Sequence, residues 1–342
     1  MEHVAIDLGG RESQICIRAS DGKIVHETRC RTRDLPTFLA QRPTSRVVLE
    51  TCAESFRIAD AAKASGHEVR VVAATLVRAL GVGSRKTKND RRDAQVMSEV
   101  SCRIDLPSVH IASTTSRERK TMLSMHDALV GSRTMMVNAV RGWMRTQGVS
   151  CRSGQVETFP KRVRAALEEG ELAPDTIERV LATIDELTAK IRDAEREIAR
   201  TAKSDATCRL LMSVPGVGPI TSVAFVSTLD QIDRFPDAHK VESYLGLVPG
   251  EDSSSDRQQR LSITKAGSSR TRWLLMQAAW SARRSASKDP MVLWSLNVEK
   301  RRGKRMAIVA LARKMAGILF AMWRHGTVYD PTKGAKAVTR DE

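Results

Sequence analysis

The feature that most constrains this 342-residue sequence is a periodic run of apolar residues near its middle. Spacings of three and four alternate strictly over Ile177, Val180, Ile184, Leu187, Ile191, Ala194 and Ile198. Such a repeat, about three heptads long, places apolar side chains along one seam of a long helix. The seam can be buried by a paired helix, within the chain or between chains, or by the rest of its own protomer.

The first hundred residues follow a different pattern, typical of strands. Short apolar or alternating runs predict strands over 3–10, 13–19, 24–30, 45–52 and 67–75. The first three are expected to form a meander, because tight turns separate them. Helical spacing predicts helices over 33–41, 55–66 and 90–103.

The rest of the chain is predicted to be mainly helical. A basic, Met-rich helix is expected over 113–148, and further helices near 268–287, 290–299 and 304–324, after a polar loop at 250–262. The predicted fold class is therefore α/β plus α. We expect an α/β domain over 1–108, a helical linker over 109–205, a mainly α domain over 206–330 and a polar tail over 331–342.

The charge balance indicates a polyanionic partner. The chain has 56 Lys and Arg against 40 Asp and Glu, and a net charge of +16 is typical of proteins that bind nucleic acid. Residues 251–325 hold 16 basic and 5 acidic residues, a surplus of +11. Aromatic residues are only 4% of the chain, which disfavours a platform for stacking single-stranded bases. The alternative is an ordinary solvated surface rich in Lys and Arg.

Composition also excludes several classes of protein. A hydrophobic content of 41% is too high for wholesale disorder, and no uncharged apolar run reaches the roughly 18 residues of a membrane span. The first residues lack the features of a secretory signal. The six cysteines show no paired spacing of a zinc site. These features together predict a cytoplasmic protein with reduced cysteines.

Four carboxylates are candidates for a metal site. Asp7 and Glu50 end two predicted strands, and Asp90 and Asp93 lie three apart on one face of a predicted helix. Carboxylates without His or Cys favour Mg²⁺, with Mn²⁺ as the alternative, and such ions can assist displacement at phosphorus. Individually, an Asp after a strand is also common in turns, and Asp90 could simply cap its helix.

Basic residues and a glycine-rich turn could contact a phosphate backbone. The cations nearest the carboxylates are Lys86, Lys88, Arg91 and Arg92. The turn SVPGVGP, with Gly216 and Gly218, has the pattern of a helix-hairpin-helix turn, which presents backbone N–H groups to phosphate. The alternatives are a solvated helix start for the first group and a purely structural turn for the second.

A Ser-rich segment lies among the cations of the last third. Ser253, Ser254 and Ser255 are followed by Arg257, Arg260, Lys265, Arg270 and Arg272. An exposed serine among cations can accept a phosphoryl group, because the cations neutralise the charge that develops at phosphorus. By composition alone the segment is a flexible linker. A second basic cluster comprises Lys300, Arg301, Arg302, Lys304 and Arg305.

The order of several motifs resembles that of a known family. The motifs are AIDLGG, VVLETC, KTKNDRRDA, SVPGVGPITS, YLGLVPGEDSSS, ITKAGSSRTRWLLMQAAW and ALARKMA. They follow one another as in the DEDD-type insertion-sequence transposases, a family that includes the pilin-gene invertase and recombinases guided by a bridge RNA. The resemblance extends over residues 3–325.

The resemblance implies two catalytic parts. The N-terminal domain is expected to be a RuvC-type, RNase H-like fold in which Asp7, Glu50, Asp90 and Asp93 bind the metal. The C-terminal transposase domain is expected to carry a catalytic serine five residues after the proline of Gly246-Leu247-Val248-Pro249, which is Ser254. This chain has Ser255 where family members usually have glycine.

The resemblance also implies a mechanism and partners. The serine of such enzymes attacks DNA to form a covalent phosphoserine intermediate, and the two sites are assembled from different protomers of a dimer or tetramer. The helices over 113–203 would hold that assembly together. DNA at the element ends and the target site would be the substrate, a structured non-coding RNA would guide the choice of sequence, and DNA-bound protein would associate with the bacterial nucleoid.

Three other functions are compatible with part of the pattern. A RuvC-like nuclease would use metal-activated water without a covalent step. A sugar-kinase-like ATPase would explain AIDLGG, but the sequence contains no second phosphate motif. A non-catalytic RNA-binding protein would explain the charge and would not need the carboxylates.

Overall fold

The chain divides into two compact units at Ala112 and Ser113. The structure, a computed structural model, describes residues 1–79, 90–167, 173–254 and 257–332. Within these ranges only the backbone is described for residues 78, 79, 90 and 252–260. The first unit is mixed α/β and the second is mainly helical, so the predicted fold class of α/β plus α is confirmed.

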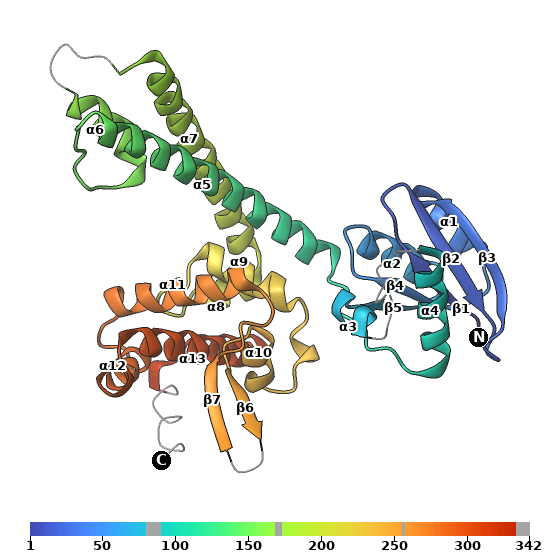
Figure 1. Cartoon of the computed structure of the whole chain (residues 1–342). Coiled ribbons are helices and arrows are strands. Elements are labelled where there is room, and N and C mark those ends of the chain that lie inside the picture. The colour runs from blue at the N-terminus through green and yellow to red at the C-terminus, as the bar shows by residue number, and fades with distance from the viewer. Residues whose placement is uncertain (80–89, 168–172, 255–256, 333–342) are drawn as a thin grey trace. The chain divides into compact units, whose positions relative to one another are not determined.

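The first unit is built on a five-stranded sheet in the order β3-β2-β1-β4-β5 (Figure 1). The strands are β1 (His3–Asp7), β2 (Glu12–Arg18), β3 (Ile24–Arg31), β4 (Arg46–Glu50) and β5 (Glu68–Val72). β1, β2 and β3 form the predicted antiparallel meander, whereas β1, β4 and β5 are parallel. This arrangement fits the RuvC-like fold that the resemblance implies.

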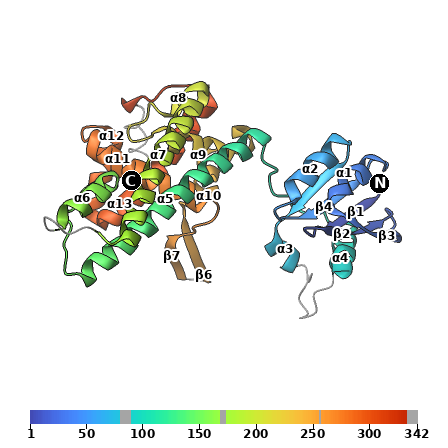
Figure 2. The same ribbon diagram turned by 90° about the horizontal axis from the view of Figure 1, so that it is seen from above.

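Helices cover both faces of this sheet (Figure 2). They are α1 (Leu35–Ala40), α2 (Ser55–Ala64), α3 (Ala74–Ala79) and α4 (Asp90–Arg103). Val4 and Ile6 of β1 pack with the α1 and α2 side, while Ala5, between them, packs with Met97 of α4. Alternate residues of β1 therefore face opposite helical layers, as the pleat requires.

The second unit contains α5 to α13 and one hairpin. Its helices are α5 (Thr114–Thr146), α6 (Phe159–Ala166), α7 (Asp175–Ser204), α8 (Ala206–Leu211), α9 (Pro219–Leu229), α10 (Ala238–Tyr244), α11 (Ser269–Ser285), α12 (Pro290–Arg302) and α13 (Lys304–His325). The core surrounds α9, whose residues from Thr221 to Leu229 are all buried. A short helix that is apolar on all sides is suited only to such a central place.

One sequence prediction in this unit was wrong. The polar loop expected at 250–262 is a hairpin of β6 (Pro249–Ser254) and β7 (Arg257–Ile263). The hairpin was missed because its residues are polar on both faces, so no apolar alternation marks it. The hairpin is evident only from the antiparallel pairing of the β6 and β7 backbones.

The periodic segment forms α7, which pairs with α5 of the same chain (Figure 1). The seam differs from the prediction in its first half. Leu181 and Thr188 are buried, whereas Val180 and Leu187, one residue earlier in each case, are partly exposed. Apolar spacing missed the position of Thr188 because a polar residue occupies it.

The middle of the α5–α7 seam is polar. His126 and Arg133 of α5 are buried, with 7% and 9% of their surface exposed. The Arg133 Nη1 donates to Thr188 Oγ1 at 3.4 Å and lies 3.3 Å from Glu157 Oε1. The His126 Nε2 lies 3.6 Å from Glu195 Oε1, and neither ring nitrogen makes a hydrogen bond within the part of the chain that the structure describes. An imidazole buried in this way costs stability.

Helix α13 has the length and mean hydropathy of a membrane span. Half of its most apolar stretch is buried in the second unit, where Ile308, Leu311 and Met315 belong to the core. Arg313 and Lys314 interrupt the stretch. These properties are those of a core helix, so length and composition alone are weak grounds for a membrane segment here.

We expect His126→Leu to stabilise the second unit. Leucine has a similar volume and removes the polar atoms that lack hydrogen bonds, and apolar replacement of buried polar groups is often stabilising. The expected rise in Tm is about 2–4 °C, measured by circular dichroism. The matched control, Leu123→Ala in the apolar part of the same helix, should lower Tm because it leaves a cavity. A lower Tm for His126→Leu would contradict the assignment.

Candidate active site

Two of the four predicted carboxylates end adjacent parallel strands. Asp7 is the last residue of β1 and Glu50 the last of β4. The pairing of Ile6 with Leu49 makes Asp7 and Glu50 the next positions along the same ladder. Both are partly exposed. They share the sheet face covered by α4, because the residues two positions earlier, Ala5 and Val48, pack there with Met97.

Helix α4 brings its first turn to the same edge of the sheet. Near its end, Ser101 Oγ is hydrogen-bonded at 2.8 Å to Nδ1 of His3, where β1 begins. In its middle, Ser98 Oγ donates to Cys16 Sγ at 3.2 Å, opposite Ala5. The helix therefore runs antiparallel to β1, and its start lies toward the end of β1. Asp93 lies in that first turn, three residues after Asp90.

The backbone thus places Asp7 and Glu50 at one end of the sheet and the start of α4 toward it, and metal ligation by the four residues stays a prediction. Among the side chains that the structure describes, no three of His, Cys, Asp or Glu form a group that could hold a metal ion. The side chain of Asp90 is outside that set. Asp7, Glu50 and Asp93 each take part in further interactions. Carboxylates as the only donors would suit a hard divalent cation.

The predicted cations beside the carboxylates have different placements. Lys86 and Lys88 lie outside the described residues. Arg92 is exposed, whereas Arg91 pairs with Glu27 of β3, donating from Nε at 3.0 Å. Hydrogen bonds from Arg91 and from Gln95 lower the pKa of Glu27. Arg91 therefore also fastens the start of α4 to the sheet.

We expect Glu27→Gln to destabilise the first unit in a pH-dependent way. Folding lowers the pKa of Glu27, so the ionised side chain stabilises the folded state. This stabilisation is fully present above the pKa that Glu27 has in the unfolded chain, and it is lost as pH falls through the pKa that it has in the folded protein. Chemical denaturation at pH 7 should show a loss of about 1 kcal/mol for these exposed charged hydrogen bonds. The difference from wild type should shrink as pH falls below the ordinary glutamate range and through the lowered folded-state pKa of Glu27. A difference that is constant with pH would contradict this cause.

The predicted nucleophile lies at the end of a hairpin strand. Ser254 is the last residue of β6 and pairs with Arg257, the first of β7. Arg257 and Arg260 are placed by backbone alone, and Ser255 is outside the described residues. At the base, Gly246 has φ +67°, and a Cβ there would overlap the backbone of Ala266. Only glycine fits this close approach.

The structure corrects the role expected for Arg272. Its side chain is buried, with 8% of its surface exposed, and Nη1 donates to Leu245 O at 2.9 Å and to Ala266 O at 2.5 Å. The guanidinium thus ties α11 to the hairpin base and does not face a ligand. Arg270 is also engaged, donating to Asp127 Oδ1 at 2.7 Å. The sequence could not separate these arginines from exposed ones, because burial depends on the tertiary packing.

We expect Arg272→Met to unfold the second unit more readily. The buried carbonyl of Leu245 would be left without this donor, and the part-buried carbonyl of Ala266 would lose its bond as well, which costs about 1–3 kcal/mol. Denaturant titration followed by tryptophan fluorescence measures the loss. Arg305→Ala, at an exposed position, is the control and should change stability by less than about 0.5 kcal/mol. Equal stability of the two variants would show that Arg272 is not structural.

The two glycines of the predicted phosphate-binding turn are placed differently. Gly216 packs closely against α11, where a Cβ would overlap the backbone of Ala278. Gly218 has open space around it and immediately precedes α9. A packing role is therefore established for Gly216, and contact with nucleic acid remains a prediction for both.

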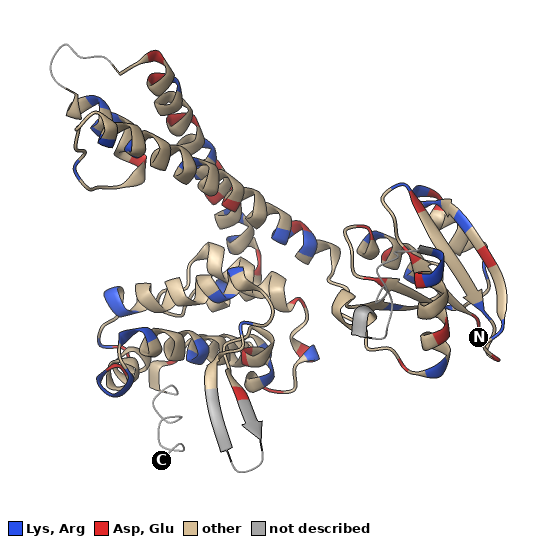
Figure 3. Cartoon of the chain, viewed as in Figure 1, with Lys and Arg blue, Asp and Glu red and all other residues tan. Residues whose placement is uncertain are grey.

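The second basic cluster is exposed throughout. Lys300, Arg301 and Arg302 end α12, and Lys304 and Arg305 begin α13. All five are exposed, and Figure 3 shows basic residues gathered at these helix ends. The Lys304 Nζ lies 5.1 Å from the centre of the Trp280 ring. This corner can attract a phosphate backbone.

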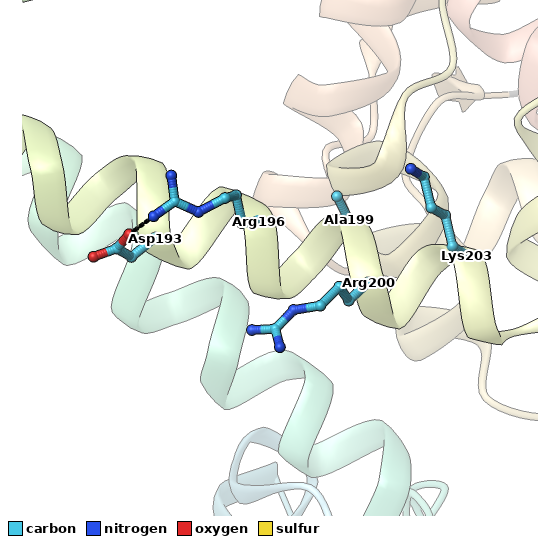
Figure 4. A pocket seen from close by; sticks show the side chains of 5 residues that line it. All are labelled: Asp193, Arg196, Ala199, Arg200 and Lys203. Carbon is cyan, nitrogen blue, oxygen red and sulfur yellow. Dashed lines mark hydrogen bonds and ion pairs between the residues drawn. The ribbon is translucent and has the colours of Figure 1, made fainter.

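A basic pocket on α7 was not predicted from the sequence. It has a volume of about 570 Å³ and is lined by Asp193, Arg196, Ala199, Arg200 and Lys203 (Figure 4). Arg196 is paired with Asp193. The spacing of Arg196, Arg200 and Lys203 by four and three residues was the available signal, since it places them on one face of a helix.

Comparison with known proteins gives two matching family models. One, described as "Transposase IS116/IS110/IS902 family", matches residues 208–291, and the other, the DEDD transposase model of IS110 described as "Transposase", matches residues 4–147. The matched ranges include Asp7, Glu50, Asp90, Asp93 and Ser254.

Curated relatives match along nearly the whole chain. The chain is 26% identical to a transposase for insertion sequence element IS1111A of Coxiella burnetii, over 95% of this chain and 90% of the relative. It is 27% identical to a probable family 20 transposase of Pseudomonas aeruginosa, over 97% and 99%. It is also 27% identical to a transposase for IS1328 of Yersinia enterocolitica, over 95% and 98%.

Proposed function

Because this chain belongs to the IS110/IS116 family of DEDD transposases, we propose that it excises and inserts an insertion sequence through metal-assisted cleavage and a covalent phosphoserine. Membership of a transposase family implies a DNA-cleaving enzyme with DNA as its partner, and the DEDD domain implies a divalent metal, usually Mg²⁺. The phosphoserine step is our proposal. The same proposal places its action on the bacterial nucleoid.

One observation carries the first half of the proposal. Asp7 and Glu50 lie side by side, one residue beyond the Ile6–Leu49 pair, at the ends of adjacent parallel strands, and the start of α4 lies toward the same edge. Asp7, Glu50, Asp90 and Asp93 would hold the metal, Mg²⁺ or Mn²⁺, through oxygen donors only. Such an ion, when bound, stabilises negative charge that develops at phosphorus. The sheet and α4 keep these carboxylates on rigid elements, which is what a precise site requires.

The serine step follows from the chemistry of the hairpin. The Ser254 hydroxyl would attack a DNA phosphorus, forming the Oγ–P bond and losing its proton, while the bond from phosphorus to one sugar oxygen breaks and that oxygen takes up a proton. Attack on the phosphoserine by a hydroxyl of another strand would reverse these changes and release the serine. Nearby cations would neutralise the transition-state charge. The hairpin position of Ser254, close to the turn, supports access to DNA.

The partners are proposed from charge and architecture. The exposed cluster Lys300–Arg305 and the α7 pocket supply cations without a stacking platform, which suits duplex DNA or a structured guide RNA that is recognised by shape and backbone. The α5–α7 pair would be the oligomerisation element of a dimer or tetramer. We assign residues 1–108 to the metal-dependent domain, 109–205 to the helical linker, 206–330 to the transposase domain and 331–342 to a polar tail.

We expect Asp7→Asn and Ser254→Ala each to abolish excision of a donor element while DNA binding persists. Loss of a nucleophile or of a metal ligand should lower the rate at least about 10³-fold, measured as the excised junction by quantitative PCR. Asp21→Asn, an exposed turn carboxylate, and Ser253→Ala are the matched controls and should keep activity. Full activity of Ser254→Ala would exclude it as the nucleophile.

A second measurement separates the proposal from a RuvC-like nuclease. Denaturing gels of wild-type protein with labelled donor DNA should show a covalent adduct that is absent in Ser254→Ala. Mass spectrometry should locate the adduct in the peptide that contains Ser254. Cleaved DNA without any adduct would favour hydrolysis by water instead.

A further inference from the structure

Lys265 has a backbone conformation that lysine rarely adopts. Its φ is +57°, and among the described non-glycine residues only Asp230 also has a positive φ. In this region the Cβ of an ordinary residue is crowded by its own backbone, and only Gly, and occasionally Asn or Asp, visits it routinely. Such a conformation persists where the surroundings impose it, often at functional sites.

The surroundings that impose it are at the base of the β6–β7 hairpin. The Lys265 N–H donates to Gly246 O at 3.1 Å, and the Thr264 N–H donates to Val248 O at 2.9 Å. On the other side, Ala266 O accepts from Arg272. These contacts hold the turn through backbone atoms on both sides of Lys265, and none of them uses its side chain. Glycine or asparagine would satisfy the same backbone with less strain.

The side chain of Lys265 is the available cation of this turn. It is exposed, and no carboxylate pairs with its ammonium among the residues whose side chains are described. The neighbouring cations Arg270 and Arg272 are both occupied, the first by Asp127 and the second by carbonyl oxygens. A residue that is strained, exposed and unpaired is difficult to explain by stability alone.

We propose that Lys265 binds a DNA phosphate at the base of the hairpin and so positions the hairpin, with Ser254 at its other end, on the duplex. This inference rests on the proposed function. The ladder from Pro249 to Ser254 separates the two ends by roughly 16 Å, at about 3.3 Å per residue. Lys265 is therefore a positioning residue that holds a phosphate away from the reacting one.

The test compares variants of the full chain that differ in charge and in strain. Lys265→Asn removes the charge and fits the left-handed backbone, whereas Lys265→Arg keeps both the charge and the strain. Binding of a fluorescein-labelled DNA duplex is measured against KCl concentration, in a Ser254→Ala background that does not cleave. We expect the slope of log K against log salt to fall by about 1 for Lys265→Asn and to stay unchanged for Lys265→Arg.

Thermal unfolding supplies the readout that separates a positioning role from a structural one. Lys265→Asn should raise Tm by about 2 °C because it relieves backbone strain, while excision in the Ser254 wild-type background falls at least about tenfold. Lys23→Asn, an exposed lysine of a turn in the first unit, is the control and should change neither Tm nor the salt slope. Gain of stability together with loss of function is the expected combination.

Several outcomes would overturn the inference. An unchanged salt slope for Lys265→Asn would show that its ammonium binds no phosphate, and a lower Tm would show that the side chain serves the fold. A change of slope with a duplex RNA stem but not with DNA would assign the contact to RNA. Because binding is measured without cleavage, absence of a phosphoserine in wild-type protein would overturn the serine step and leave the result on Lys265 standing.

Discussion

The parallel pairing of β1 with β4 is the constraint on which the candidate active site depends. Hydrogen bonds of the ladder align Ile6 with Leu49, so the next residues, Asp7 and Glu50, lie side by side at the sheet edge. A slip of one residue would send one of the two carboxylates to the opposite face, toward α1 and α2. The register is held because Val4, Ile6, Val47 and Leu49 are fully buried on that opposite face.

In the second unit, a polar hairpin is attached to an apolar helical core. Helix α9 is buried on all sides, and α5, α7 and α11 pack around it. From this core the β6–β7 hairpin extends with polar residues on both faces, so its own packing contributes little to its position. Its base is instead held by backbone hydrogen bonds and by Arg272 of α11. A rigid base under a polar strand suits a hairpin that meets a ligand rather than a core.

The apolar periodicity predicted helix α7 correctly but predicted the buried face of that helix only in part. The existence, length and helicity of α7 followed from apolar spacing, and its partner was one of two open possibilities. The seam itself was displaced in its first half, because Leu181 and Thr188 are buried whereas Val180 and Leu187 are partly exposed. Apolar spacing identifies only hydrophobic side chains as buried. The helix pair also buries two polar side chains of α5, His126 and Arg133, which the spacing could not indicate.

The sequence by itself determined the strands of the first unit and its helices apart from α3, the long helices of the second unit, the basic surplus and the order of the four carboxylates. These features depend on local spacing and composition, which the chain carries without reference to its fold. Only the tertiary structure decided that 250–262 is a hairpin, that Arg272 is internal and that Lys265 is exposed in a strained turn. The reason is that burial, strand pairing and backbone strain arise between segments distant in sequence. Three cations of one motif, Lys265, Arg270 and Arg272, thus have the same charge and three different surroundings: solvent, a carboxylate and backbone carbonyls.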